Sequence, residues 1–224
     1  MLVARREERL REIAGEIGGE WEICDVGDRH AVEQTAAAIT ARYPAIELLV
    51  NNAGLSARSD FLSADPERIE EVIRVNYLGG IWCLRAFLVA LEAGAPSHLV
   101  NVVSVAGTVA VGRSGPYTAS KHAQLAFSRT IGPALRRRGI AVHTILPGFV
   151  ETEGFPQRRT LPRAFHWAII EPEEVAEAIM GAVQDDKPEL FVPRWYRLPA
   201  LAQALAPGLV RRLGGGRRKT GSRV

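Results

Sequence analysis

The stretch Leu99 to Lys121, LVNVVSVAGTVAVGRSGPYTASK, joins an apolar run to a proline-led segment through small residues and glycines. The run Leu99 to Val103 has the length and composition of a buried β-strand, and Ser104 ends it. Pro116 suits the first turn of a helix, so a helix is predicted over 116–137. A buried strand followed by a helix is typical of α/β proteins with a parallel sheet.

The same order of strand and helix recurs along the rest of the chain. This alternation predicts an α/β fold with three layers, in which helices cover both faces of a parallel sheet. Strands are predicted at 2–4, 21–25, 46–50, 98–103, 140–146 and 189–192, and the other helices at 5–17, 28–42, 66–93, 172–184 and 198–213.

The pattern brings three reactive side chains, those of Ser104, Tyr117 and Lys121, to one place. Tyr117 and Lys121 stand at i and i+4 and therefore share one helix face, and an ammonium beside a phenol lowers the phenol's pKa. Ser104 lies at the carboxyl edge of the sheet, where ligands bind in open α/β folds. Taken singly, a Tyr and a Lys four apart are usually without chemical meaning, and Ser104 alone is more often a strand-end cap.

Further short motifs accompany these three residues, each at a predicted strand end or helix. Together they resemble the short-chain dehydrogenase/reductase family over residues 1–195, nearly all of the globular part. The motifs are Asp25-Val26, Asn51-Asn52-Ala53-Gly54, Asn76 in a helix interior, Ser104, Tyr117 with Lys121, and Pro147-Gly148 followed by Val150 and Thr152.

The resemblance implies a Rossmann-like fold and a role for each matched residue. It assigns Tyr117 as the general acid/base and Ser104 as the group that orients and polarises a substrate carbonyl. It assigns Lys121 to the nicotinamide ribose and Asn76 to a proton-relay water. Asn is a poor helix former, and we predict a functional kink at Asn76.

The resemblance also assigns cofactor contacts. Asp25 and Val26 would meet the adenine. Residues 51–54, including Asn51, Ala53 and Gly54, would line the adenosine half, although Asn and Gly also favour a plain turn. Pro147, Gly148, Val150 and Thr152 would flank the nicotinamide carboxamide, beside Tyr117 and Lys121. No metal site is predicted.

The chain departs from the family at its beginning. The family opens with a strand, a turn of Thr-Gly-x-x-x-Gly-x-Gly type and a helix, whose backbone N–H groups hold the pyrophosphate. Here the first residues resemble the second strand, so a βα unit of about thirty residues is expected to be missing before Met1. Gly15, Gly18 and Gly19 do not replace it, because they follow a polar helix.

Two explanations for this departure stay open. The Arg-over-Lys bias, 25 against 3, fits a GC-rich genome in which a Val codon is read as a start, so Met1 would be assigned too late. Alternatively the truncation is real. The resemblance implies a strand order 3-2-1-4-5-6-7, so the missing strand would leave a central gap with two unpaired edges.

The choice between NADP and NAD depends on the residues after the first predicted strand. An acidic residue there would bind the ribose 2′-hydroxyl of NAD, whereas Arg accommodates the 2′-phosphate of NADP. Arg5 and Arg6 therefore favour NADP. The alternative is that both arginines only solvate the first helical turn.

Composition indicates one globular domain over residues 1–195, followed by a C-terminal helix and basic tail over 196–224. A chain of 224 residues with 47% hydrophobic composition can bury a substantial core. Cys24 and Cys83, predicted in a strand and a helix, are too few for a disulfide framework and indicate a reducing, cytoplasmic setting. We see no signal peptide and no stretch long and apolar enough to span a bilayer.

Charge is distributed unevenly. Residues 190–224 carry eight Arg or Lys and no acid, whereas the remainder has a net charge of −5. Residues 198–213 are compatible with an amphipathic helix that makes a weak peripheral contact with an anionic membrane. A helix that closes the pocket or joins a dimer is the favoured alternative. Nucleic acid is not an expected partner, because no base-reading motif accompanies the tail.

These features predict an NAD(P)-dependent oxidoreductase that interconverts a hydroxyl and a carbonyl on a hydrophobic small molecule. Residues 153–170 should form a loop and short helices over the pocket, with apolar side chains toward the substrate. A homodimer or homotetramer is expected through the helices at 66–93 and 116–137. The alternatives are a non-catalytic relative without a working cofactor site and a membrane-surface lipid-binding protein. The candidate pocket side chains are Phe155, Leu161, Phe165 and Trp167.

Overall fold

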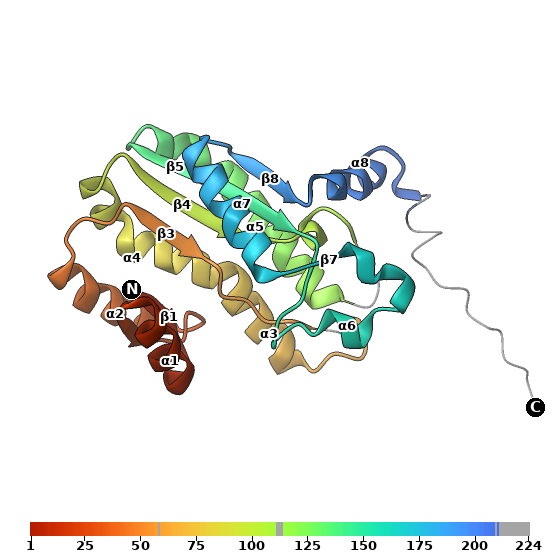
Figure 1. Cartoon of the computed structure of the whole chain (residues 1–224), viewed down its shortest axis with the longest axis horizontal. Helices are drawn as coiled ribbons and strands as arrows, with labels where there is room; N and C mark the ends of the chain where they lie inside the picture. Colours follow the sequence, from red (N-terminus) through yellow and green to blue (C-terminus); the bar gives the residue numbers. More distant parts are fainter. Residues whose placement is uncertain (58, 111–113, 209, 211–224) are drawn as a thin grey trace, which may run out of the picture.

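A four-stranded parallel sheet forms the centre of the fold (Figure 1). The computed structural model describes residues 1–57, 59–110, 114–208 and 210. The predicted α/β class is therefore confirmed, with strand boundaries within two residues of those expected. In spatial order the strands are β3 (Leu48–Asn51), β4 (Ser97–Val102), β5 (Ile140–Pro147) and β8 (Glu189–Val192).

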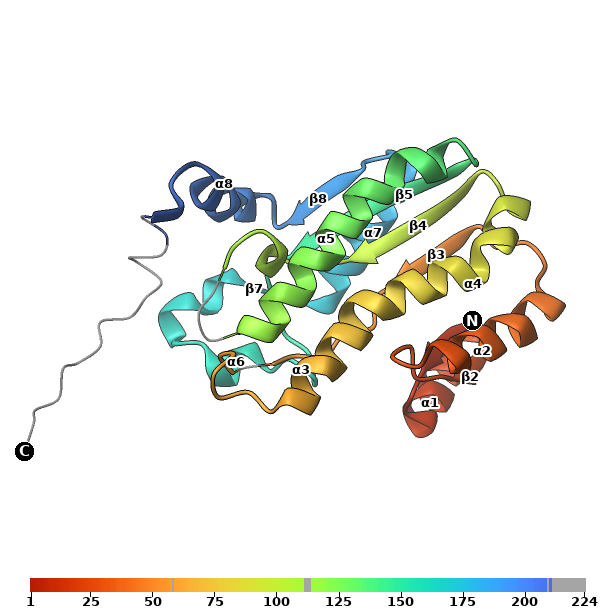
Figure 2. The same cartoon turned by 180° about the vertical axis from the view of Figure 1, so that it is seen from behind.

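Helices cover both faces of this sheet, as predicted. Successive residues of a strand point to opposite faces. Leu99 accordingly packs with residues of α4 and α5, while Val100 packs with residues of α7. Helices α4 and α5 lie on one face (Figure 2) and α7 on the other (Figure 1). Their bounds are α4 (Gly79–Ala93), α5 (Gly115–Arg136) and α7 (Pro172–Gln184), and α2 (Arg29–Arg42) packs beside α4.

The first two strands form a separate parallel pair. β1 (Leu2–Ala4) pairs with β2 (Trp21–Ile23) and does not pair with β3. Helix α1 (Glu7–Ile17) connects the two strands along the chain. Among the described residues β3 has no partner at its outer edge, and Leu48 and Val50 are each 38% exposed. The predicted gap in the sheet is confirmed. Its apolar edges are open to pairing with another strand.

The long apolar helix predicted over 66–93 is interrupted at Asn76. It comprises α3 (Pro66–Ile73), a π-helical turn η1 (Arg74–Leu78) and α4, so the helix is irregular at the predicted place, and a functional role for this irregularity stays a prediction. The expectation that no stretch could span a bilayer is wrong. The 28-residue segment Pro66–Ala93 meets that criterion by length and composition, since an 18-residue window within it has a mean hydropathy of 1.4. In this fold α4 packs against β3, β4 and α2, which accounts for its apolar character.

The C-terminal third contains short elements that periodicity did not resolve. The predicted loop and short helices over 153–170 are present, flanked by a two-stranded sheet that was not predicted. The helix predicted over 198–213 is present up to Leu205. Pro207, Gly208 and Val210 are helical again, and residues 209 and 211–224 lie outside the described residues. Cys24 follows β2 instead of lying in it, and is buried. The short elements of this third are β6 (Phe149–Val150), α6 (Gln157–Thr160), η3 (Arg163–Ala168), β7 (Ile169–Ile170), η4 (Arg194–Tyr196) and α8 (Arg197–Leu205). Earlier in the chain, the short helix η2 (Val105–Gly107) follows β4.

Two histidines stack on each other near the amino ends of β4 and β5. Their rings lie 5.2 Å apart, and His98 Nδ1 is 3.0 Å from His143 Nε2. His143 Nδ1 lies 2.8 Å from the Lys187 carbonyl oxygen and donates to it, because a carbonyl oxygen can only accept. His143 is fully buried. The bonded pair therefore requires at least one neutral ring.

This pair is expected to make the fold sensitive to acid. Burial, and then the neighbouring His143, lower the pKa of His98 below its usual value. Between that lowered value and about 6.5 the unfolded chain binds more protons than the folded one, so the free energy of unfolding decreases as pH falls. Urea unfolding at pH 8 and pH 5 should show a smaller loss in His98→Gln than in the unmodified chain. An equal loss would exclude the pair as a cause, and His30→Gln, on the surface, is the control.

Candidate active site

Ser104, Tyr117 and Lys121 come together at the carboxyl ends of β4 and β5. Ser104 caps η2, where its Oγ accepts from the Ala106 N–H at 3.1 Å and donates to the Pro147 carbonyl at 3.4 Å. Tyr117 lies in the first turn of α5, where the Ser104 hydroxyl acts to lower the pKa of its phenol. The three residues are therefore neighbours, as their spacing predicted.

The electrostatics of Tyr117 differ from the expectation. Burial raises the pKa of its phenol above the usual value, and the hydrogen bond with Ser104 opposes that shift only in part. The Lys121 ammonium lies 5.9 Å from the ring centroid. The predicted lowering of the phenol's pKa is therefore not found in this structure, where burial is the largest influence on that pKa. Tyr117 is thus held in its protonated form.

Lys121 is itself buried, with 4% of its surface exposed. Its Nζ donates to the Val102 carbonyl at 3.1 Å and to Gln124 Oε1 at 2.8 Å. Burial lowers its pKa to about 7. The lysine is therefore poised between its charged and neutral forms near neutral pH, and Gln124 is a neighbour that the sequence motif did not indicate.

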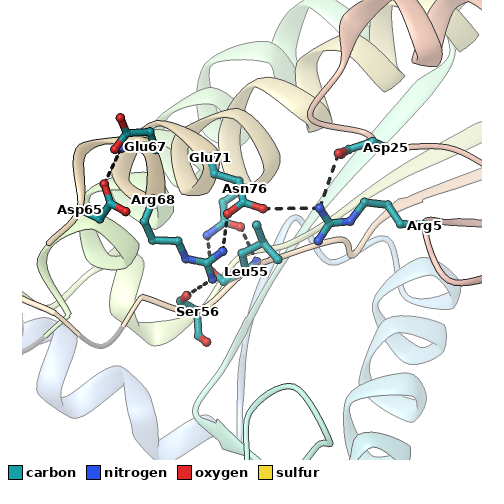
Figure 3. A network of polar contacts seen from close by, with 9 residues as sticks. All are labelled: Arg5, Asp25, Leu55, Ser56, Asp65, Glu67, Arg68, Glu71 and Asn76. Atoms are coloured by element: carbon teal, nitrogen blue, oxygen red, sulfur yellow. Dashed lines mark hydrogen bonds and ion pairs between the residues drawn. The ribbon is translucent and has the colours of Figure 1, made fainter.

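Asn76 fastens the loop after β3 to the start of α5 (Figure 3). Its Oδ1 accepts from the Leu55 N–H at 2.7 Å, and its Nδ2 donates to the Leu55 carbonyl at 3.0 Å and to Ser120 Oγ at 2.9 Å. Ser120 Oγ in turn donates to the Tyr117 carbonyl at 2.7 Å. The π-helical turn thus aims Asn76 at the chain on both sides of the site.

The side-chain amide of Asn51 is hydrogen-bonded to other groups of the protein. Its Nδ2 donates to Asn101 Oδ1 at 2.9 Å and to the Gly80 carbonyl at 3.2 Å. Asn101 Nδ2 continues to Ser128 Oγ at 2.9 Å, which meets Thr144 Oγ1 at 2.7 Å. This buried chain of polar groups joins β3, β4, α5 and β5. Sequence patterns did not indicate this chain of polar groups, because Asn101 lies within an apolar strand.

Arg5 follows β1 and enters a polar network that includes Asp25 (Figure 3). Its Nη1 lies 3.6 Å from Asp25 Oδ2 and 3.4 Å from Glu71 Oε1. Arg68 pairs with the same Glu71 and donates to the Ser56 carbonyl at 2.6 Å. The hydrogen bond from Arg68 lowers the pKa of Glu71. The network joins the separate β1–β2 unit to α3 and to the loop after Gly54.

Arg6 and Val26 bring further predicted residues to the same region. Arg6 Nη1 pairs with Glu153 Oε2 at 3.1 Å, although both side chains are largely exposed. The Val26 carbonyl approaches Gly79 so closely that a Cβ there would lie 2.9 Å from its oxygen. The predicted adenine side therefore contacts both the start of α4 and the loop after β6.

The segment Pro147 to Thr152 turns away from the sheet through Gly148. The Gly148 N–H donates to the Val192 carbonyl at 2.9 Å, and a Cβ on Gly148 would lie 1.9 Å from the Tyr196 ring. Tyr196 is 5% exposed and donates to the Ala168 carbonyl at 3.0 Å. Gly148 is required here by this close approach.

Gly148→Ala is expected to destabilise the fold by about 2–3 kcal/mol, because the methyl group would overpack a buried ring that has no free space to move into. Urea unfolding measures the loss. Gly154→Ala is the matched control, since a Cβ there meets nothing within 4 Å, and it should change stability by less than about 0.5 kcal/mol. Equal effects of the two substitutions would contradict the packing described.

The candidate pocket residues separate into two groups. Phe155 lies on Tyr117, with ring centroids 5.9 Å apart, and Leu161 is half-buried. Phe165 and Trp167 instead face solvent, at 52% and 71% exposed, and Trp167 packs on Trp195 at 5.1 Å. Only Phe155 is thus seen against the predicted catalytic group.

The described residues fit the nicotinamide ribose of a dinucleotide better than its pyrophosphate. A Cβ on Gly54 would lie 3.8 Å from Lys121 Nζ and 3.6 Å from Asn76 Oδ1, so a bare backbone lines the space beside the lysine, as a ribose would require. The pyrophosphate half has no glycine-rich turn at a helix N-terminus among the described residues. Gly18, with φ of +63°, caps the C-terminus of α1, where the helix dipole disfavours anions.

A parallel sheet covered on both faces, with Ser, Tyr and Lys at its carboxyl edge, defines a Rossmann-like α/β protein of the dehydrogenase type. The chain belongs to the short-chain dehydrogenase family, whose model matches residues 1–161.

Curated relatives include the mouse (Mus musculus) 17-beta-hydroxysteroid dehydrogenase 13, which is 30% identical over 184 residues, 81% of this chain and 59% of that protein. The human (Homo sapiens) estradiol 17-beta-dehydrogenase 11 is 31% identical over 174 residues, 76% of this chain and 57% of that protein. The chain thus spans less than two thirds of the length of these relatives.

Solved structures agree on the fold. A short-chain dehydrogenase from Burkholderia cenocepacia, in complex with NADP, is 26% identical and superposes with a TM-score of 0.78 over 94% of this chain and 84% of that one. An alcohol dehydrogenase from Thermococcus sibiricus, complexed with 5-hydroxy-NADP, is also 26% identical, with a TM-score of 0.73 over 85% and 83% of the two chains.

Proposed function

We propose that the chain is the catalytic part of an NADP-dependent oxidoreductase that interconverts a hydroxyl and a carbonyl on a hydrophobic small molecule. The observation that carries this proposal is the convergence of Ser104, Tyr117 and Lys121 at the carboxyl ends of β4 and β5. Membership of the family and the cofactors bound by its relatives support it.

Two of these residues, Tyr117 and Ser104, act on the substrate oxygen. In the reductive direction a bound nicotinamide would supply the hydride to the carbonyl carbon. Tyr117 donates its phenolic proton to the carbonyl oxygen, and the Ser104 hydroxyl donates a hydrogen bond as negative charge develops there. The raised pKa of Tyr117 keeps that proton available at neutral pH. Oxidation of an alcohol uses the same groups in reverse.

Nicotinamide absorbance tests this function directly. NADPH is mixed with a panel of ketones and aldehydes, and NADP with the corresponding alcohols, graded in apolar surface. Turnover that increases with the apolar surface of the substrate supports the proposal. Cofactor binding without turnover across the panel would favour a non-catalytic relative of the family.

We further propose that Arg5 and Arg6 select NADP over NAD. Arg5 lies beside Asp25 and Glu71 with its side chain 49% exposed, so one face of the guanidinium is open to a 2′-phosphate. Removing a charge that contacts phosphate should raise the Kd for NADPH about tenfold or more, with little change for NADH. Arg5→Ala and Arg6→Ala test this against Arg9→Ala, in helix α1, which begins directly after them. Equal losses for both cofactors would overturn the assignment.

The assembly proposed is a homodimer or homotetramer through α4 and α5. Val89 supports it, because this apolar side chain on α4 is 78% exposed. Light scattering after size-exclusion chromatography measures the mass in solution. Val89→Glu should shift the protein toward the monomer, and an unchanged mass would direct attention to another face.

A second candidate function is contact with an anionic membrane surface. Helix α8 has no buried residue, and Leu198, Leu201 and Leu205 are 62%, 47% and 83% exposed. Trp167 and Trp195 stack nearby. Exposed leucines and tryptophans beside arginines are typical of helices that lie in the lipid interface. The proposed contact is therefore with the headgroup region and does not require a spanning segment.

Sedimentation with liposomes tests this contact. We expect the protein to bind vesicles of phosphatidylcholine with 30% phosphatidylglycerol about ten times more tightly than vesicles of phosphatidylcholine alone. The difference is expected because two arginines lie near this surface. Leu198→Ser with Leu205→Ser should abolish it, whereas Ile17→Ser, at an exposed site on α1, should not. Equal binding to both vesicle types would exclude the electrostatic contribution.

A further inference from the structure

Gln124 lies one turn after Lys121 on α5, on the buried side of the helix. It is 2% exposed, and its Oε1 accepts a hydrogen bond from Lys121 Nζ at 2.8 Å. Burying a polar amide is costly unless it is hydrogen-bonded. A glutamine in this position therefore indicates that its partner, the ammonium group, requires it.

The ammonium group has three N–H donors. The Val102 carbonyl, at 3.1 Å, and Gln124 Oε1 take two of them. No third acceptor for Lys121 is seen in the part of the chain that the structure describes. The space beside the group is bounded by the Gly54 backbone, where a Cβ would lie 3.8 Å from Nζ. The third N–H is left for a ligand hydroxyl on that side.

The charges around Lys121 explain why the acceptor is an amide. The elements packed against this part of α5 present the Asn76 amide from η1, the Ser104 hydroxyl before η2 and the Val102 carbonyl from β4, all neutral. Tyr117 is the neighbouring titratable group. A carboxylate in place of Gln124 would pair with the ammonium and cancel its field at the site, whereas an apolar side chain would leave the cation with one fixed acceptor.

We propose that Gln124 is a positioning residue: its side-chain oxygen fixes the Lys121 ammonium and directs the remaining N–H toward the cofactor ribose. The inference extends the proposed function, since it gives the lysine of that site its orientation. Gln124 itself contacts neither substrate nor cofactor, and it acts through Lys121 alone. No feature of the Tyr-x-x-x-Lys spacing specifies it.

The titration of Lys121 in the cofactor-free protein tests this inference without any need for turnover. The chain contains three lysines, at positions 121, 187 and 219. Selective ¹³Cε-lysine labelling therefore gives three NMR signals, and Lys187→Arg and Lys219→Arg assign that of Lys121 by elimination. The titration midpoint of each Gln124 variant is then compared with that of the unmodified chain.

Gln124→Met should lower the Lys121 midpoint by about one pH unit, because it removes an acceptor that favours the charged form. Gln124→Glu should raise it by about one unit or more, because it adds an opposite charge. Thr118→Val is the matched control on α5: its hydroxyl is buried without a hydrogen-bond partner among the described residues, so its loss should leave the midpoint unchanged. Opposite shifts are not expected from a general disturbance of packing.

An unchanged Lys121 midpoint in either Gln124 variant would overturn the inference, so it stays falsifiable if one variant fails to fold. In active enzyme, the alkaline limb of the kcat/KM profile should shift in the same direction as the midpoint. The two proposals fail separately. An inactive wild type that shows the opposite shifts contradicts only the oxidoreductase, and an active wild type without them contradicts only the role of Gln124.

Discussion

Tyr117→Phe is expected to lower kcat by about 10³-fold while leaving the fold intact. The substitution removes only the phenolic oxygen, which is the group that would donate the proton to the substrate. The ring remains against Phe155 at the same place. NADPH oxidation with the best carbonyl substrate measures the loss, and circular dichroism with thermal unfolding measures the fold.

Tyr43→Phe is the matched control for this substitution. Tyr43 ends α2, is 44% exposed and bonds to Glu20 at 2.6 Å, remote from the site in sequence and environment. It should retain full activity. Substantial turnover in Tyr117→Phe would contradict the mechanism, because no other hydroxyl in the described site is assigned the proton.

Asn76→Ala is expected to cost about 2–4 kcal/mol of stability and most of the activity. The amide makes three hydrogen bonds, and its loss leaves the Leu55 N–H and carbonyl without their buried partner. It also releases Ser120, which bonds to the Tyr117 carbonyl. Urea unfolding gives the change in stability, and kcat gives the effect on Tyr117.

Asn52→Ala is the control for stability, since Asn52 is exposed in the loop after β3. It should change the free energy of unfolding by less than about 0.5 kcal/mol. If Asn76→Ala unfolds at the same urea concentration as the unmodified chain, the three bonds do not hold the loop, and the account of the π-helical turn is wrong.

Much of the fold was predictable because its signals are local. The apolar run before Ser104 and the proline before Tyr117 specify a strand and a helix, and both form where expected. Asn76 inside an apolar helix indicated a kink, and a π-helical turn lies there. The gap beside β3 was also predicted, and among the described residues β1 pairs with β2 and not with β3.

The interior of the site was less predictable because desolvation depends on the whole fold. The spacing of Tyr117 and Lys121 indicated that they are neighbours, but not that burial would raise the pKa of one and lower that of the other. Gln124 and Asn101 gave no signal either, because a single polar residue in an apolar segment does not reveal its partner. Their roles depend on contacts with distant strands.

The most direct test of the central claim is a cofactor titration. Two proteins are compared: the 224-residue chain alone, and the same chain joined to an N-terminal strand, a Thr-Gly-x-x-x-Gly-x-Gly turn and a helix. Each is titrated with NADPH and with NADH while nicotinamide fluorescence and the midpoint of thermal unfolding are followed. We expect saturable binding of NADPH by the joined chain, tighter than that of NADH, with a higher unfolding midpoint. Binding of neither cofactor to either form would contradict it.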